Sequence, residues 1–331
     1  CDSLCGTADN LLLPCNCTCI AFPKHPHLSR RKPCETPLHK TVKMCETSKS
    51  VPRKIYIYNN LLDSLRTLCL RKGFLQKCAM WKSNCSMGKF IDVFDGAMWQ
   101  RFMFFDGRPF FDLGFMLNVD WFQPYDHVQY SVGVIYLVIL NLPRVERYKM
   151  ENIIIVGCIP GPREPCNMNS YLRPLVDDLL KLWKGITVTL PSSNEVVIRG
   201  ALLGVSCDIP ATRKICGFSG HSATMGYSKC LKQFPCLGFG EKNDYSGFER
   251  DEWQHRDMSQ HLKAVECVQS SLTPTQMDVA VKKSGVKYSE LLRLPYFNII
   301  TQHVIDAMHN MYLGTAKHMI SVWKESGIIG N

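Results

Sequence analysis

The chain lacks an apolar segment long enough to cross a bilayer. Its longest apolar run, residues 131–142, is far shorter than the ~20 residues that a membrane-spanning helix requires. The first residues also lack the basic segment and uninterrupted apolar stretch that mark a secretory signal peptide. No membrane partner is therefore expected. Because the chain opens on Cys1 and stops at Asn331 just after an amphipathic stretch, we interpret it as an internal fragment of a longer product.

The composition also lacks the features of a disordered protein. Hydrophobic residues make up 46% of the chain and charged residues 21%, which is typical of a folded protein. The 331 residues are enough for two or three domains. Acidic residues are the scarcer charged type, 29 against 39 basic ones, so the net charge is +10. This excess favours a polyanionic partner without specifying its sequence.

Cysteine is too rare for a disulfide scaffold but is unevenly placed. The chain has 17 cysteines, about 5% of its residues and below the ~8–10% of such scaffolds. Seven of them lie in the first 45 residues, which favours a zinc-binding module in a reducing compartment. Disulfides and unliganded thiols remain the alternatives. Tetrahedral zinc needs four ligands, and two pairs of cysteines offer them: Cys1, Cys5, Cys15 and Cys19. Unranked alternatives are Cys17, Cys34, His25 and His27.

Four parts are expected along the chain. They are a Cys-rich region (1–50), a mostly helical subdomain (51–110), an α/β core (111–230) and a C-terminal part (231–331), which the family resemblance given below implies to be a helical insertion. The first part contains a basic stretch with Arg30, Arg31 and Lys32. This stretch is either a solvated loop or a patch that contacts phosphates or directs the protein to the nucleus.

The core has the pattern strand, strand, strand, helix, strand. Apolar runs predict the strands, and an apolar stripe with helical spacing predicts the helix. The expected ranges are 112–119, 130–141, 152–158, 170–184 for the helix, and 196–206. Ser170 is the expected N-cap of the helix, Pro174 lies near its first turn, and Gly185 ends it.

An aspartate follows the first strand and another follows the fourth. Short connections allow the first three strands to pair antiparallel, whereas the crossover helix allows the fourth to lie parallel to the first. Asp120 and Asp208 would then emerge together at carboxyl ends, where open α/β sheets bind ligands. Two close carboxylates need a cation such as Mg²⁺ or Mn²⁺, and two such ions can catalyse displacement at phosphorus. This is the arrangement of the RNase H-like fold, although strand-end aspartates are commonly only solvated loop residues.

Several segments resemble CACTA (En/Spm, Tnp2-like) transposases of animal genomes. The segments around the two aspartates, 117–125 (LNVDWFQPY) and 207–214 (CDIPATRK), carry much of the resemblance, together with 303–310 (HVIDAMHN). Further matching segments are 127–133, 160–165, 172–180, 217–223 and 294–297. The similarity covers roughly residues 34–331.

The resemblance implies a nuclear DDE/D transposase that cleaves phosphodiester bonds and transfers strands at transposon ends. Its partners would be the terminal repeats and the target DNA, and it would act as a homo-oligomer. Asp120 and Asp208 would be the first two acids of an Mg²⁺- or Mn²⁺-binding triad within an RNase H-like core interrupted by a helical insertion. The third acid is expected beyond Asn331, and Glu290 and Glu325 are interpreted as exposed helix-surface charges.

The resemblance also implies a second metal site, with one departure from the family. A Cys-x-x-Cys pair after the second aspartate is thought to bind zinc with later histidines, which here would be His309 and His318. Tyr227 replaces the first cysteine and leaves Cys230 alone. Either another residue substitutes (Cys216, His221 or Cys236) or the site has decayed. Tyr227 thus favours the alternative function, an inactive domesticated or decayed transposase that binds DNA or protein.

Overall fold

The computed structural model describes most of the chain as two compact units. The described residues are 8–12, 39–44, 47–52, 55–83, 88–102, 104, 111–220, 223–234, 249, 251 and 253–330. The first unit, called here the sheet unit, comprises residues 1–204 and 288–297. The second, called the helical unit, comprises residues 205–287 and 298–331. The division into four parts made from the sequence stays a prediction.

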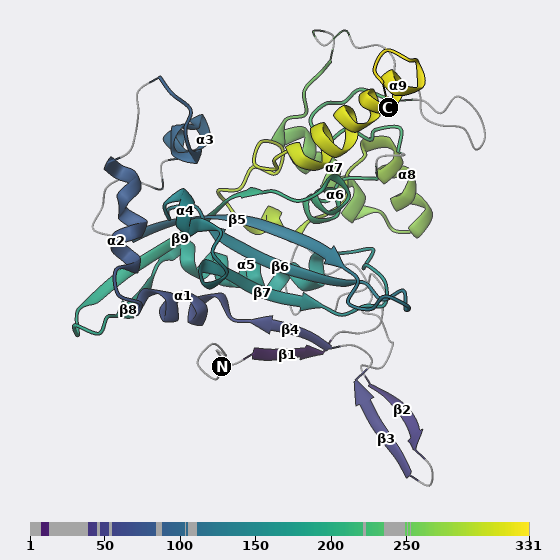
Figure 1. Ribbon diagram of the computed structural model, residues 1–331. Coiled ribbons are helices and arrows are strands. Elements are labelled where there is room, and N and C mark those ends of the chain that lie inside the picture. The colour runs from purple at the N-terminus through teal and green to yellow at the C-terminus, as the bar shows by residue number, and fades with distance from the viewer. Residues whose placement is uncertain are drawn as a thin grey trace. The chain divides into compact units, whose positions relative to one another are not determined.

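A seven-stranded mixed sheet organises the sheet unit (Figure 1). Its strand order is β1-β4-β7-β6-β5-β9-β8. The strands are β1 (Ala8–Leu12), β4 (Ile55–Asn59), β5 (Phe111–Phe122), β6 (Val132–Ile139), β7 (Ile153–Ile159), β8 (Ile186–Thr189) and β9 (Glu195–Val205). A separate two-stranded sheet pairs β2 (His39–Met44) with β3 (Thr47–Pro52).

The three predicted antiparallel strands are confirmed. β5 pairs with β6 from Phe115–Ile139 to Phe122–Val132, and β6 pairs antiparallel with β7. Successive side chains along β5 point to opposite faces of the sheet, as in any β-strand. One face carries four buried side chains, those of Leu113, Phe115, Leu117 and Val119. The opposite face carries Asp120.

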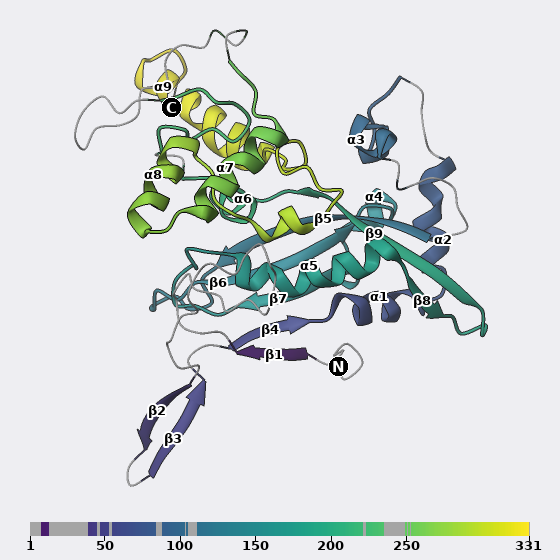
Figure 2. The ribbon, with the colours of Figure 1, turned by 180° about the vertical axis from the view of Figure 1, so that it is seen from behind.

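The fourth predicted strand is β9, and it lies beside β5 as expected. Arg199 of β9 forms an ion pair with Asp112 of β5. Leu203 of β9 packs against Gly114 of β5 so closely that a Cβ atom on this glycine would lie only 2.6 Å from Cδ1 of Leu203. The residue numbers rise together along both strands, so β9 runs parallel to β5 (Figure 2). The sequence did not predict β8, which forms an antiparallel hairpin with β9.

Helix α5 (Asn169–Lys184) makes the crossover that precedes β8 and β9. Its apolar stripe is buried, as the spacing predicts, and Gly185 ends it with a φ of 104°. The predicted N-cap is wrong, because Met168 occupies that position and Ser170 is the second helical residue. Pro174 is the sixth residue and therefore lies inside the helix rather than in its first turn.

The predicted helical subdomain (51–110) contains short helices, but its first residues belong to the end of β3 and to β4 of the main sheet. Its helices are α1 (Leu61–Cys69), α2 (Phe74–Ala79) and α3 (Ala97–Arg101), with 3₁₀ turns at Met80–Ser83 and Val93–Asp95. Asn60 caps α1, because its side-chain oxygen accepts hydrogen bonds from the backbone N–H groups of Leu62 and Asp63. Farther along the unit lie α4 (Arg144–Arg147) and 3₁₀ turns at Met150–Asn152 and Glu290–Arg293.

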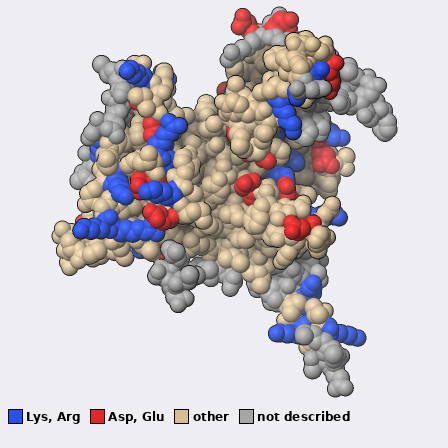
Figure 3. Space-filling view, viewed as in Figure 1, with Lys and Arg blue, Asp and Glu red and all other residues tan. Residues whose placement is uncertain are grey.

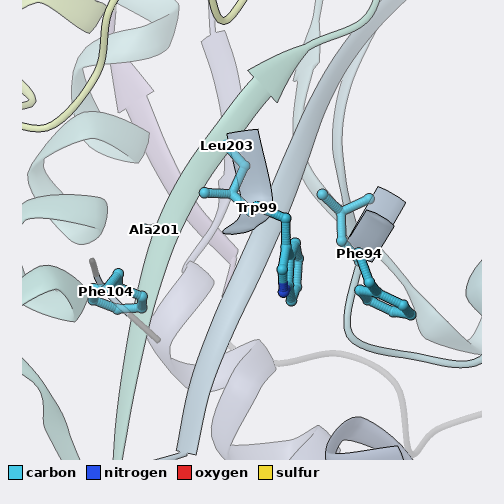
Figure 4. Packing of buried hydrophobic residues seen from close by; sticks show 6 residues of the cluster. Phe94, Trp99, Phe104, Ala201 and Leu203 are labelled. Atoms are coloured by element: carbon cyan, nitrogen blue, oxygen red, sulfur yellow. The ribbon is translucent and has the colours of Figure 1, made fainter. Parts of the chain in front are cut away.

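An aromatic cluster covers part of β9 (Figure 4). Trp99 of α3 and Phe94 lie edge-to-face with ring centroids 4.9 Å apart, and both belong to the same cluster as Ala201 and Leu203 of β9. Phe104 also belongs to the cluster and stacks on Trp183 at the end of α5. Edge-to-face and stacked aromatic pairs add to the free energy gained from burial. The cluster therefore fixes β9 beside β5.

Helices predominate among the described elements of the helical unit. They are α6 (Ile209–Cys216), α7 (Met258–Ser270), α8 (Pro274–Ser284), a π-helix (Met308–Ala316) and α9 (Lys317–Glu325). Of these elements, α7, α8, the π-helix and α9 lie after residue 230. Within the described ranges, no helix is both long and apolar enough to span a membrane.

Candidate active site

Asp120 lies near the carboxyl end of β5, on the face opposite the buried side chains. It pairs across the strands with Val134 of β6, and its side chain is exposed. One carboxylate oxygen, Oδ1, accepts a hydrogen bond from the backbone N–H of Trp121 at 2.8 Å. The strand thus presents a carboxylate to solvent at the position that the sequence predicts.

Asp208 follows the last residue of β9, Val205, by three positions and begins helix α6. Its Oδ1 accepts a hydrogen bond from the backbone N–H of Ala211 at 2.7 Å, so Asp208 is the N-cap of the helix. Pro210 stands in the first turn, where its missing N–H costs nothing. The side chain is half-buried. The sequence predicts the location of Asp208 but not this capping role.

The chemistry of both aspartates fits a hard divalent cation. Each carboxylate has about four lone-pair sites, and the hydrogen bond from a backbone N–H occupies one of them. The remaining oxygen sites are of the type that Mg²⁺ and Mn²⁺ prefer. The described part of the chain contains no group of three or more His, Cys, Asp or Glu side chains placed to hold a metal ion. The role of both aspartates therefore stays a prediction.

The predicted zinc ligands of the helical unit differ in their surroundings. Cys230 is buried, whereas His309 and His318 are exposed. Nδ1 of His309 contacts the carboxylate of Asp306. Cys216 is buried at the end of α6, and burial raises the pKa of its thiol. Within the described part of the chain these side chains form no group of three or more that is placed to hold a metal ion, so this zinc site also stays a prediction.

Other candidate residues lie outside the described residues. Two of these are His221 and Cys236, the possible substitutes in the second zinc site. The remaining ones are the N-terminal candidates for zinc and phosphate binding, Cys1, Cys5, Cys15, Cys17, Cys19, His25, His27, Arg30, Arg31, Lys32 and Cys34.

Sequence reasoning missed a partly buried polar cluster next to Tyr227. Nζ of Lys229 donates to the backbone carbonyls of Ile300 (2.6 Å) and His303 (2.8 Å), and Oγ of Ser228 is hydrogen-bonded to Nε2 of His303 (2.8 Å). Burial lowers the pKa of Lys229 to about 8 and that of His303 to about 4. These bonds fasten the segment around Cys230 to residues 298–304. Nothing in the local sequence pattern distinguishes such a lysine from an exposed one.

The prediction that Glu290 is an exposed charge on a helix surface is wrong, whereas Glu325 is exposed as predicted. Glu290 is fully buried, and its carboxylate accepts a hydrogen bond from Nη1 of Arg293 at 2.9 Å. Its backbone N–H donates to Oδ1 of Asn169 at the start of α5. Burial raises the pKa of Glu290 despite the arginine. Glu290 therefore helps to hold residues 288–297 against α5 and is not part of a helix surface.

Comparison with known protein families gives one match. Residues 95–277 match the family model described as transposase family tnp2, and this segment contains both Asp120 and Asp208. No curated protein matches the chain significantly in sequence. Because the matched segment spans more than half of the 331 residues, the chain belongs to transposase family tnp2.

Proposed function

We propose that the protein is a CACTA-type DDE/D transposase in which Asp120 and Asp208 hold divalent cations for cleavage and transfer of DNA strands. One observation carries the proposal: both aspartates lie within the transposase family match and next to the carboxyl ends of neighbouring strands. Asp120 belongs to β5, and Asp208 follows β9 by three residues.

The strand order supports an RNase H-like core. β7, β6 and β5 form an antiparallel set, and β9 is added beside β5 after the crossover helix α5. Parallel neighbours end at the same edge of a sheet, and open α/β sheets bind their ligands at such edges. The adjacency of β5 and β9 in the sheet therefore supports the proposal.

The protein's own groups would position the ions rather than carry out covalent chemistry. Bound Mg²⁺ or Mn²⁺ would activate the attacking oxygen and stabilise the leaving oxygen of the phosphodiester. Asp120 and Asp208 would supply oxygen ligands from two backbone positions whose carboxylates are already oriented by N–H groups. Such orientation lowers the cost of arranging the ligands when a metal binds. Zinc remains a proposal for the cysteine-rich segment and for the region around Cys230.

The charge of the chain agrees with a DNA partner. A net charge of +10 favours phosphate backbones, and transposon ends and target DNA are the expected substrates. Action on genomic DNA implies the nucleus, and pairing of two transposon ends implies a homo-oligomer.

The alternative is an inactive transposase that keeps a binding function. Tyr227, in place of a family cysteine, is half-buried and packs edge-on against Trp253 with ring centroids 6.4 Å apart. This position therefore has a packing role that needs no metal. The N-cap bond of Asp208 likewise gives a structural reason to keep this aspartate without catalysis.

Substitution by asparagine separates catalysis from folding. Asn caps helices as well as Asp does, so Asp208→Asn removes the charge and keeps the α6 cap. Asp120→Asn removes the other charge. The matched controls are Asp257→Asn, which alters the exposed N-cap of α7, and Asp126→Asn, which alters an exposed loop carboxylate.

Two measurements test the proposal. The first is Mn²⁺ binding to the 331-residue chain, followed by electron paramagnetic resonance. The second is Mg²⁺- or Mn²⁺-dependent strand cleavage, assayed with this chain and with a version extended past Asn331. Asp120→Asn and Asp208→Asn should each weaken Mn²⁺ binding at least about tenfold and abolish cleavage, because each removes a metal ligand. The controls should change neither. If all four variants bind Mn²⁺ as the wild type does, the metal site is wrong and the binding function is favoured.

A further inference from the structure

The β2–β3 hairpin is unusual because it belongs to no larger sheet. Its strands pair in register from His39–Pro52 to Met44–Thr47, and within the described residues they pair only with each other. Neither strand contributes to the seven-stranded sheet. Among the described residues the hairpin is therefore a separate two-stranded ribbon rather than part of the seven-stranded sheet.

Each face of the hairpin carries lysine, and nearly all of its described side chains are exposed. Residues that pair directly across an antiparallel ribbon share a face. One face carries Lys40, Val42, Lys49 and Val51, and the other carries Thr41, Lys43, Ser48 and Ser50. All eight are exposed except Val51, which is half-buried. Lys40 and Lys49 are diagonal neighbours on the first face, so they present two charges side by side.

The charged residues of strands β2 and β3 are all basic. The described residues of β2 and β3 include three lysines and no acid, as Figure 3 shows for the described part of the hairpin. The sequence of residues 39–54 contains five basic residues and a single acidic one, Glu46. Some other cations of the sheet unit pair with acids, as Lys77 does with Glu146 at 3.0 Å. The hairpin lysines are therefore suited to an external anion.

The hairpin gains little stability from apolar burial. A two-stranded ribbon is at best marginally stable in water without further strands or a helix packed on it. Both faces of this ribbon are exposed within the described residues, so its backbone pairing provides most of its stability. A partner that contacts the lysines would add stability to the paired form.

We propose that the β2–β3 hairpin binds duplex DNA, with its lysines on the phosphate backbone and the ribbon in the major groove. The inference rests on the proposed transposase function and adds an interaction surface that neither aspartate provides. The major groove, about 12 Å wide, admits a two-stranded ribbon, whose strands lie about 4.8 Å apart. Lysines on both faces match the two phosphate backbones that flank the groove. The hydroxyls of Thr41, Ser48 and Ser50 can hydrogen-bond to phosphates or base edges.

Substitution of the three lysines tests the hairpin directly. The test variant is Lys40→Gln, Lys43→Gln and Lys49→Gln in the 331-residue chain. The matched control replaces three exposed lysines from separate segments, Lys72, Lys89 and Lys283, by glutamine. Both variants lower the net charge equally, so a difference between them reports the position of the charges. All of these side chains are exposed, so the far-UV circular dichroism and thermal unfolding of both variants should match the wild type.

The readout is the affinity for a fluorescent DNA duplex across a salt series, measured by anisotropy without divalent cations. Each lysine that contacts a phosphate contributes about 0.9 to the slope of log K against log salt. The test variant should therefore lose up to about 2.7 from this slope and bind at least about tenfold more weakly at about 0.1 M salt. The control should keep a slope close to that of the wild type. Backbone amides of β2 and β3 should also become more protected from hydrogen exchange when DNA binds.

Three outcomes would overturn the inference. They are an unchanged slope in the test variant, an equal loss in both variants, or a test variant that loses binding to polyglutamate but keeps binding to DNA. The last outcome would assign the hairpin to an acidic protein. The assay contains no divalent cation, so it does not depend on the metal site. Failure of the hairpin inference would leave the Asp120 and Asp208 results unchanged, and failure of those variants would leave the salt slopes unchanged.

Discussion

Arg199 of β9 and Asp112 of β5 form a two-point ion pair between neighbouring strands. Nε of Arg199 lies 2.7 Å from Oδ1 of Asp112, and Nη2 lies 2.9 Å from Oδ2. Both side chains are less than a tenth exposed. Nη2 also donates to the carbonyl of Phe104, and the guanidinium lies over the Phe104 ring. The pair sets the alignment of the two strands that lead to Asp120 and Asp208.

Removal of one partner of this pair should destabilise the sheet unit. Asp112→Ala leaves a buried guanidinium without its carboxylate, which typically costs about 3–5 kcal/mol. The free energy of unfolding, from urea denaturation of the 331-residue chain, should fall by that order. The double variant Asp112→Leu, Arg199→Met removes both charges and should recover much of the loss. A single variant as stable as the wild type would contradict a buried, energetically important pair.

Gly157 of β7 should not tolerate a side chain. A Cβ there would lie 2.6 Å from Cζ of Tyr56, whose fully buried ring packs edge-on against Tyr171 of α5. The ring cannot move aside without disturbing that contact, so Gly157→Ala should cost about 1–3 kcal/mol through overpacking. Urea denaturation checks the value. Tyr56→Leu in the Gly157→Ala background removes the obstructing ring, and it should make the glycine substitution less costly than it is alone.

The sequence predicts the core strands well because their signals are local. The β-branched runs of β6 and β7, and the apolar stripe of α5, mark their elements within a residue or two. The edge strand β8 escaped prediction because its four residues carry too little pattern to stand out. β4 escaped because it pairs with β7, nearly a hundred residues away. Its surroundings in the sequence indicate helix instead.

The positions of the two candidate aspartates could be predicted from the sequence, but the contacts of the residues around them could not. A strand followed by an acid is visible in the sequence, so Asp120 and Asp208 could be named. The N-cap bond of Asp208 depends on where α6 begins, and the burial of Glu290 depends on its contacts with Arg293 and Asn169. Charged residues are usually exposed, and only tertiary contacts make an exception such as Glu290.

The N-cap role of Asp208 predicts different stabilities for two substitutions. Asp208→Ala removes the acceptor for the N–H of Ala211 and should cost about 1 kcal/mol. Asp208→Asn keeps an acceptor and should change stability by only a few tenths of a kcal/mol. Urea denaturation of both variants, with Asp257→Ala as a second cap deletion, gives the comparison. Equal stability of the Ala and Asn variants would contradict the capping role. Metal binding should be lost in both variants if the proposed function holds.

Two buried histidines should make the helical unit sensitive to acid. His261 and His303 each lie edge-on or tilted against Phe218 at 5.4 Å between ring centroids, and both are nearly inaccessible to solvent. Burial lowers the pKa of each to about 4, and nearby cations act in the same direction. These are Arg256 for His261, and Lys229 and Arg213 for His303. The folded protein therefore holds both imidazoles neutral at pH values where the unfolded chain protonates them.

The pH dependence follows from this difference. Above about pH 6.5 both states carry neutral histidines, so these groups add no pH dependence. As the pH falls toward 4, the unfolded state binds more protons, so stability falls by up to about 1.4 kcal/mol per pH unit for each histidine. The free energy of unfolding, measured in urea between about pH 7 and 5, should decrease accordingly.

His261→Phe isolates one of the two contributions. Within the described residues neither ring nitrogen of His261 has a hydrogen-bond partner, so a phenyl ring can replace the imidazole without losing a bond. The variant should be at least as stable as the wild type at pH 7, and its stability should fall less steeply toward pH 5. His127→Gln, on an exposed loop, is the control and should keep the wild-type slope. An unchanged slope in His261→Phe would show that His261 titrates alike in the folded and unfolded chain.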